Sequence, residues 1–425
     1  MMPKFNYLLI AMLLTPILGV NAQSLSIEKA TMAAIANDPW LAGNRHNQAA
    51  LVAQSAAANV EVDPVISISL LNMPIDSFSF GQEGMTQLKL GISQQFARGD
   101  LLALKSQKIL VTSEQFPLLR LNRQAQLKAN ISELWLRVYQ IDRSIALINN
   151  DRPLFEQLVD IAESSYSSTL GKTRQQDVIR AQLELLRLDD RLTKLSQQKA
   201  KFLRLMGQWV PLNLLDLPLE NTLPPMNWPT IVFKAQPLAQ AFAQHPSVTA
   251  IERKIASQVI GVDVAKQSYK PKWGVNASYG YRSDMPNNTS RADLFSVGVS
   301  FDLPLLGTEK QDQGVNAARS KVEAVKTDKL LMLKIMIAKA QSLNAQFKQS
   351  KIRHQLYTSQ LLPQTHQQAE ASLNAYANDS GDFAEVMRAR ITELNTAIEL
   401  LNIEIEQRIL QAQVNYYFTD SRVKD

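Results

Sequence analysis

The chain has no cysteine among its 425 residues. It can therefore form neither a disulfide bond nor a thiolate metal site, and it offers no cysteine for attachment of a lipid anchor. The absence of thiols is compatible with an oxidising compartment, where a free cysteine could pair wrongly. We therefore expect no lipid anchor.

Glycine and proline are also scarce, with 15 and 18 copies. This low content argues against an all-β protein, and long stretches rich in Ala, Leu, Gln, Lys and Arg favour extended helices. Acidic and basic residues nearly balance, at 39 and 45, which gives a formal net charge of +6. A balance this mild over a long chain does not indicate a nucleic-acid partner.

Signatures of catalysis are missing as well. His46, His245, His354 and His366 are scattered, with no pair at metal-ligand spacing. The sequence contains no glycine-rich phosphate loop and no nucleophile elbow. His245 lies in the segment AFAQHP, where the similar segment AIANDP has Asp38, so we expect a polar turn role for it. The sequence predicts neither an enzyme nor a cofactor.

The N-terminus has the pattern of a secretory signal. Lys4 precedes a short apolar run, and the small residues Val20 and Ala22 follow it. The run is too short to span a bilayer, which favours a cleaved signal peptide over residues 1–22. No later run reaches the roughly 20 apolar residues of a membrane-spanning helix. We expect an exported protein.

An internal repeat organises the rest of the chain. The segment LKLGIS resembles the segment FSVGVS 207 residues later, and the same shift relates Pro39 to Pro246 and Pro64 to Pro271. A repeat of about 200 residues indicates a duplicated domain rather than a solenoid unit. The predicted organisation is a signal peptide (1–22), a first repeat (23–211), a proline-rich connector (212–235), a second repeat (236–418) and a tail (419–425).

Each half is predicted to contain a helix, two strands and a long helical region. The first helices are expected at about 26–61 and 236–268. In the long regions, apolar residues alternate at spacings of four and three, as in the series Leu127, Ile131, Leu134, Val138, Ile141, Ile145 and Ile148. Such heptads predict helices packed side by side as coiled coils.

Breaks in the long helical regions come from glycine and proline. Reversals are expected near Gly171 and Gly381, where glycine would supply a left-handed C-cap conformation. Three prolines inside the helical regions, Pro117, Pro153 and Pro363, should kink them.

Four segments alternate apolar with small or polar residues: 65–71, 87–96, 273–281 and 295–303. In an exported protein, an apolar face against lipid and a polar face against water are typical of outer-membrane barrel strands. Four strands cannot close a water-filled barrel, so this interpretation requires several chains to share one. The alternative is a soluble sheet packed on a helix layer. The predicted lipid-facing residues are Ile66, Ile68, Leu88, Leu90, Ile92, Trp273, Val275, Tyr279, Phe295, Val297, Val299 and Phe301.

Several local segments carry a resemblance to a known family. They are LGKTRQQDVIRAQLEL (170–185), GISQQF followed by RGD (91–100), LPLLGTEKQ (303–311) and LLPQT…AYANDSGDFAEVMRAR (361–390). Together with the order and spacing of the two halves, they make the chain similar to the TolC-like outer-membrane efflux proteins. The second half most resembles the channels of heavy-metal pumps of the resistance-nodulation-division class, which are CusC- and CzcC-like. Many of those relatives begin with a lipidated cysteine, which this chain lacks.

The resemblance implies a mainly α fold with a membrane β-barrel, in which a homotrimer closes one 12-stranded outer-membrane barrel above a helical periplasmic tunnel. The implied function is the exit duct of a tripartite efflux system in the outer membrane of a Gram-negative bacterium. Its partners would be a periplasmic membrane-fusion adaptor, an inner-membrane pump and outer-membrane lipid. Heavy-metal cations are the implied substrate. Drug efflux, type I secretion, and a periplasmic coiled-coil scaffold without a pore are the alternatives.

The resemblance also implies two sites at the helical reversals. Leu170, Gly171, Ser380 and Gly381 would contact the adaptor, although a purely structural turn role is the alternative. In relatives, acidic residues shortly after the second reversal line the narrow closed entrance.

Glu385 matches that acidic position best, whereas Arg388 departs from the acidic pattern. A contact between Asp382 and Arg174 is a candidate for holding the entrance shut. The alternative is that these groups are solvated charges at helix ends, complementing the helix dipole. Met73 and Met285 lie in the loops that connect the strands, where soft-metal binding and simple loop packing both remain open.

Overall fold

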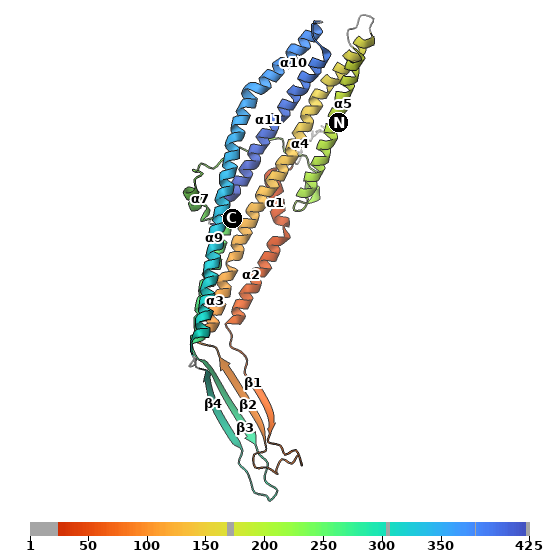
Figure 1. Ribbon diagram of the computed structural model, residues 1–425. Helices are drawn as coiled ribbons and strands as arrows, with labels where there is room; N and C mark the ends of the chain where they lie inside the picture. Colours follow the sequence, from red (N-terminus) through yellow and green to blue (C-terminus); the bar gives the residue numbers. More distant parts are fainter. Residues whose placement is uncertain (1–23, 168–173, 303–306, 379, 422–425) are drawn as a thin grey trace, which may run out of the picture.

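Long helices and a four-stranded sheet occupy opposite ends of an elongated molecule (Figure 1). The computed structural model describes residues 24–167, 174–302, 307–378 and 380–421. The predicted signal peptide lies outside the described residues. Among the described helices, none combines the length and apolar character needed to cross a bilayer.

The element order is the same in the two halves of the chain. The first half runs α1 (Ile27–Asn37), α2 (Pro39–Ala58), β1 (Val65–Leu71), β2 (Gln87–Phe96), α3 (Leu101–Ser113), α4 (Gln115–Ser167) and α5 (Gln175–Met206). The short α6 (Leu212–Leu215) follows. The second half runs α7 (Ala235–Phe242), α8 (Pro246–Lys266), β3 (Lys272–Tyr281), β4 (Leu294–Asp302), α9 (Glu309–Leu356), α10 (Leu362–Ala377) and α11 (Phe383–Tyr417). The boundaries of the proposed repeats, connector and tail stay predictions.

The first helix of each half is broken, so the predictions of one continuous helix over 26–61 and over 236–268 were both wrong. Asp38 separates α1 from α2 and caps α2, which begins at Pro39. In the second half His245 caps α8, which begins at Pro246. Proline is favoured in the first turn of a helix because it has no N–H to leave unsatisfied there. The polar turn role expected for His245 is confirmed.

The prolines of the long helices act differently from one another. Pro153 lies inside α4, which continues through it. Pro363 is the second residue of α10 and follows a π-helical turn at Tyr357–Leu361. Because Pro363 has no N–H, it cannot bond to the carbonyl four residues earlier. The chain changes direction there, between α9 and α10 (Figure 1).

Heptad residues of α4 fill the helical core. Leu127, Ile131, Val138 and Ile148 are fully buried. One cluster packs Trp135 and Met206 against Ile405 of α11, and another, nearer the helical reversals, packs Phe155 against Met387. Full burial of each such side chain contributes about 1.5–3 kcal/mol. This packing holds α5 and α11 on the two sides of α4.

The described strands form one antiparallel sheet in the order β1-β2-β3-β4. They begin and end within one residue of the predicted segments, except that position 303 lies outside the described residues. Register is fixed by cross-strand pairs such as Ile68 with Leu90, Leu90 with Tyr279, and Tyr279 with Phe295.

Candidate functional site

One face of the sheet is a continuous apolar surface, which we call the apolar face. It contains the twelve residues that the alternation predicted to share a face, and their exposed fractions run from 41% at Val275 to 75% at Ile68. Cross-strand pairs join them into rows, because paired residues in neighbouring strands point to the same side of a sheet. One such row runs Ile66, Ile92, Ala277 and Val297. No described helix covers this face.

Aromatic residues mark both ends of the apolar face. Near the helices, Phe96 pairs with Trp273, and Trp273 pairs with Phe301 at a ring-centroid distance of 5.3 Å. Tyr279 and Tyr281 lie at the loop end of β3. From Trp273 to Tyr281 the strand rises about 27 Å. An apolar band about 25 Å tall between aromatic girdles is typical of an outer-membrane barrel.

The opposite face is polar and built from small side chains, and we call it the polar face. Ser67, Gly91, Ser278 and Ser296 form one row across all four strands. A Cβ atom placed on Gly91 would stand 2.7 Å from the Ser67 hydroxyl oxygen, so the row is closely packed. The two faces of the sheet therefore differ in character, one apolar and the other polar.

Both edges of the sheet are open. Among the described residues, β1 pairs only with β2 and β4 pairs only with β3. Each edge strand therefore presents backbone N–H and C=O groups that a further strand can satisfy.

The second helical reversal is a tight turn between α10 and α11. Asp382 caps α11, and its carboxylate accepts a hydrogen bond from the Ala384 N–H at 3.1 Å. The Ser380 N–H donates to the Ala375 carbonyl at 2.9 Å. A Cβ on Gly381 would lie 2.8 Å from the Tyr376 nitrogen. Gly381 does not adopt the left-handed conformation that the sequence suggested; the turn requires glycine because α10 leaves no space for a side chain.

The predicted entrance residues are engaged locally. Glu385 pairs with Arg388 on the same helix. The Arg174 N–H donates to the Asp177 carboxylate at 3.1 Å at the start of α5. Among the described residues of one chain, no ion pair joins Arg174 to Asp382. Leu170 and Gly171, at the first reversal, lie outside the described residues.

A buried guanidinium that the sequence reasoning missed joins α10 to α11. Arg390 is only 9% exposed, and it pairs with Glu370 of α10 at 2.6 Å and with Glu393 at 2.9 Å. His366 of α10 contacts the same Glu393. The hydrogen bond from Arg390 lowers the pKa of Glu370. The sequence offered one signal for this buried charge: Arg390 lies between Met387 and Ile391, two apolar residues at heptad spacing.

Asp151 of α4 faces this group of charges without an ion-pair partner among the described residues. Burial raises the pKa of the Asp151 carboxyl, and the negative charge of Glu393 raises it further, while Arg390 acts in the opposite direction. The cluster of Asp151, His366, Glu370, Arg390 and Glu393 thus carries more negative than positive charge when His366 is neutral.

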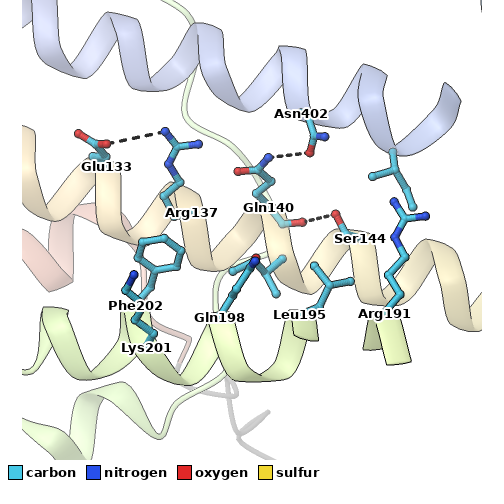
Figure 2. Close-up of a pocket in the computed structure, with 12 residues that line it drawn as sticks. Glu133, Arg137, Gln140, Ser144, Arg191, Leu195, Gln198, Lys201, Phe202 and Asn402 are labelled. Carbon is cyan, nitrogen blue, oxygen red and sulfur yellow. Dashed lines mark hydrogen bonds and ion pairs between the residues drawn. The ribbon is translucent and has the colours of Figure 1, made fainter. Parts of the chain in front are cut away.

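A polar groove of about 620 Å³ lies between α4, α5 and α11 (Figure 2). Gln140 donates to the Asn402 side chain at 2.6 Å across it, and Arg191 donates to Asn395 at 2.6 Å beside it. Burial lowers the pKa of the Arg191 guanidinium. The groove has no arrangement of nucleophile and base, and its hydrogen bonds fix α11 on α4 and α5.

No protein-family model and no curated protein matches the chain. Solved structures do match. The outer membrane channel CmeC of Campylobacter jejuni is 13% identical, with 94% of this chain and 87% of that chain covered and a TM-score of 0.75. The outer membrane protein VceC of Vibrio cholerae is 12% identical, with 93% and 96% covered and a TM-score of 0.74.

CusC, whose structures describe transmembrane channel formation, is 12% identical, with 93% and 92% covered and a TM-score of 0.74. These likenesses establish the fold: a mostly helical chain with a four-stranded antiparallel sheet, as in solved outer-membrane channels. CusC is no more similar than the others, so the fold does not single out the heavy-metal subgroup.

Proposed function

We propose that the chain is the outer-membrane channel of a tripartite efflux system and conducts substrate passively to the exterior. The observation that carries this proposal is the apolar face, which is exposed on all four strands and bordered by aromatic rows. A soluble protein rarely exposes a contiguous apolar surface of this kind, and surfaces of this kind mark interaction sites with membranes or proteins. Lipid against the apolar face and water against the polar face satisfy both surfaces.

The proposed assembly is a homotrimer that shares one 12-stranded barrel. Four strands cannot enclose water, and the two open sheet edges favour strand addition by neighbouring copies. The free side of α5 supports helix packing between copies as well. Ile179, Leu183 and Leu186 are exposed there at heptad spacing, which is the pattern of a helix that packs on another helix.

The proposed partners are a periplasmic adaptor at the helical reversals and an inner-membrane pump. Heavy-metal cations stay the proposed substrate on the strength of the motif resemblance in residues 361–390, with drugs and secreted polypeptides as the alternatives within the same fold. The pore-free periplasmic scaffold is disfavoured, because it leaves the apolar face without a partner.

Fractionation and bilayer recording together test the proposal. The full chain should be found in the outer-membrane fraction, require detergent for extraction, and produce discrete conductance steps in planar lipid bilayers. A protein that remains soluble without detergent and gives no conductance would contradict the proposal and revive the scaffold.

A further inference from the structure

Near its loop end the polar face carries one charged strand residue, Lys89, which is the third residue of β2 and lies level with Ser69 and Gly280. Two further charges, Lys272 and Asp302, stand where β3 and β4 meet the helices, and the Lys272 N–H donates to the Asp302 carboxylate at 2.8 Å. The rest of the polar face consists of serine, glycine and uncharged amides, with the apolar residues Val65, Leu71 and Leu294 at strand ends. Lys89 is therefore the one charged strand residue in the loop half of the polar face.

The neighbours of Lys89 are small and leave its charge uncompensated. Register places Ser69 on one side of it and Gly280 on the other. The charges at the helical rim are paired, Arg98 with Asp302 and Lys270 with Asp100, whereas Lys89 has no acidic partner among the described residues. The flexible stem can therefore carry the ammonium group away from the sheet into solvent.

We propose that Lys89 makes the local potential positive at the loop end of the barrel lumen, so that anions are enriched at this level of the duct. This inference rests on the proposed function, since it requires the polar face of three chains to line one lumen. Three-fold symmetry turns one lysine into three ammonium groups at the same level, and rings of lysine or arginine favour anions. The effect is strongest near the wall, because charge is screened over about 10 Å at 0.1 M salt.

The absence of native cysteine allows a direct measurement of the local potential. Ser69→Cys places a unique thiol opposite Lys89, with Cβ atoms about 4.5–5.5 Å apart. Isolated membranes that contain the full chain are treated separately with an anionic and a cationic methanethiosulfonate reagent of similar size, and the two modification rates are compared. The ratio of the rates reports the potential, because a change in thiolate content affects both reactions equally.

Replacing Lys89 by Gln in the Ser69→Cys chain should lower the anionic-to-cationic rate ratio by about three- to ten-fold at low salt, the range for one unit charge at this separation. Lys89→Arg is the matched control and should leave the ratio unchanged. Ser300→Cys, on the same face but near the helical end of β4, should show a smaller effect of Lys89→Gln.

Two negative results are distinguishable. A Ser69→Cys thiol that reacts readily, with a ratio that Lys89→Gln does not alter, would overturn the role of Lys89 and leave the proposed duct intact. A Val297→Cys thiol that reacts with the charged reagents as fast as Ser69→Cys, or a Ser69→Cys thiol that does not react, would overturn the assignment of the polar face to a lumen and with it the proposed function.

Discussion

Val297 and Ser296 are neighbours in β4 whose side chains belong to opposite faces of the sheet. Val297 pairs with Ala277 on the apolar face, and Ser296 pairs with Ser278 on the polar face. Val297→Arg should lower the yield of trimer in outer-membrane fractions, because arginine near the bilayer midplane costs roughly 2–4 kcal/mol. Ser296→Arg is the matched control and should insert nearly normally. Equal yields of the two variants would refute the orientation of the strands.

Glu385 is the residue that best matches the acidic position expected to line the narrow entrance. Its carboxylate pairs with Arg388, so Glu385→Gln removes a negative charge and leaves a positive one without its partner. We expect weaker cation preference and weaker block by divalent cations in planar bilayers, because rings of carboxylates favour cations. Glu323→Gln removes a similar exposed pair, with Lys326, on α9. Identical selectivity and block in both variants would make Glu385 an ordinary surface charge.

Asp151 should make the stability of the helical end depend on pH. Its pKa is raised from 3.8 in the folded chain, so the folded state binds this proton more tightly than the unfolded state. The stabilisation from this bound proton is fully present below the ordinary pKa of an aspartate. It is lost as the pH rises through the raised pKa of Asp151 in the folded chain. Asp151→Asn should therefore raise the melting temperature near neutral pH, and the difference should vanish in acid.

The control for this prediction is Asp190→Asn, which removes an exposed carboxylate paired with Lys194. It should not reproduce the pH-dependent difference in melting temperature. A wild-type chain that melts higher than Asp151→Asn at neutral pH would contradict the raised pKa.

At the residue scale, the sequence predicted side-chain positions best in the strands, where the period of two is simple. The period of two in the sequence assigned all twelve residues of the apolar face to the same side of the sheet, because each strand residue has only two possible sides. The charges at the reversals were harder to interpret. The pairing of Glu385 with Arg388 and the capping by Asp382 depend on where α11 begins, which a pattern defines only to within a few residues. The cluster around Arg390 depends on three helices whose relative placement no local pattern gives.

Among the elements, the turn between α10 and α11 is the accessible candidate for adaptor contact. Gly381 has no room for a side chain, so a bulky residue there would distort the turn itself. Ser380 is exposed and is the better probe. Ser380→Trp should abolish cross-linking to the adaptor while trimers still form, because it adds bulk on the exposed side and keeps the backbone hydrogen bond from the Ser380 N–H to the Ala375 carbonyl.

The matched control for docking is Ser359→Trp, which lies in the π-helical turn remote from the reversal. It should leave cross-linking to the adaptor intact. Normal cross-linking and normal efflux by the Ser380→Trp chain would rule out this turn as the docking site.

Helix interruptions show the limit of prediction for elements. The heptads gave the long helices correctly, since buried a and d positions repeat over many turns. The breaks at Asp38 and His245 were missed. Pro39 and Pro246 were the signals available in the sequence, because proline is favoured in the first turn of a new helix. The π-helical turn before Pro363 has no sequence period of its own, and the backbone adjusts there to a missing hydrogen bond.

For the whole molecule, duplication and alternation in the sequence predicted the strands and the repeated order of elements, while the family resemblance implied a sheet at one end of long helices, and the fold agrees (Figure 1). In the proposed trimer, closure of the sheet requires several chains, so neither the sequence pattern nor one folded chain supplies it. The central claim is therefore that β1 of one copy pairs with β4 of the next.

Disulfide cross-linking of the cysteine-free chain tests that claim most directly. Double variants combine Ser67→Cys or Ser69→Cys in β1 with Ser296→Cys or Ser300→Cys in β4, all on the polar face. Within one chain β2 and β3 separate these strands, so a disulfide can form only between copies. We predict that at least one pair oxidises to a covalent trimer with no larger species, and that each single variant does not. If every double variant remains monomeric after oxidation, or if oxidation gives a series of covalent species larger than trimer, the result would contradict a barrel shared by three chains.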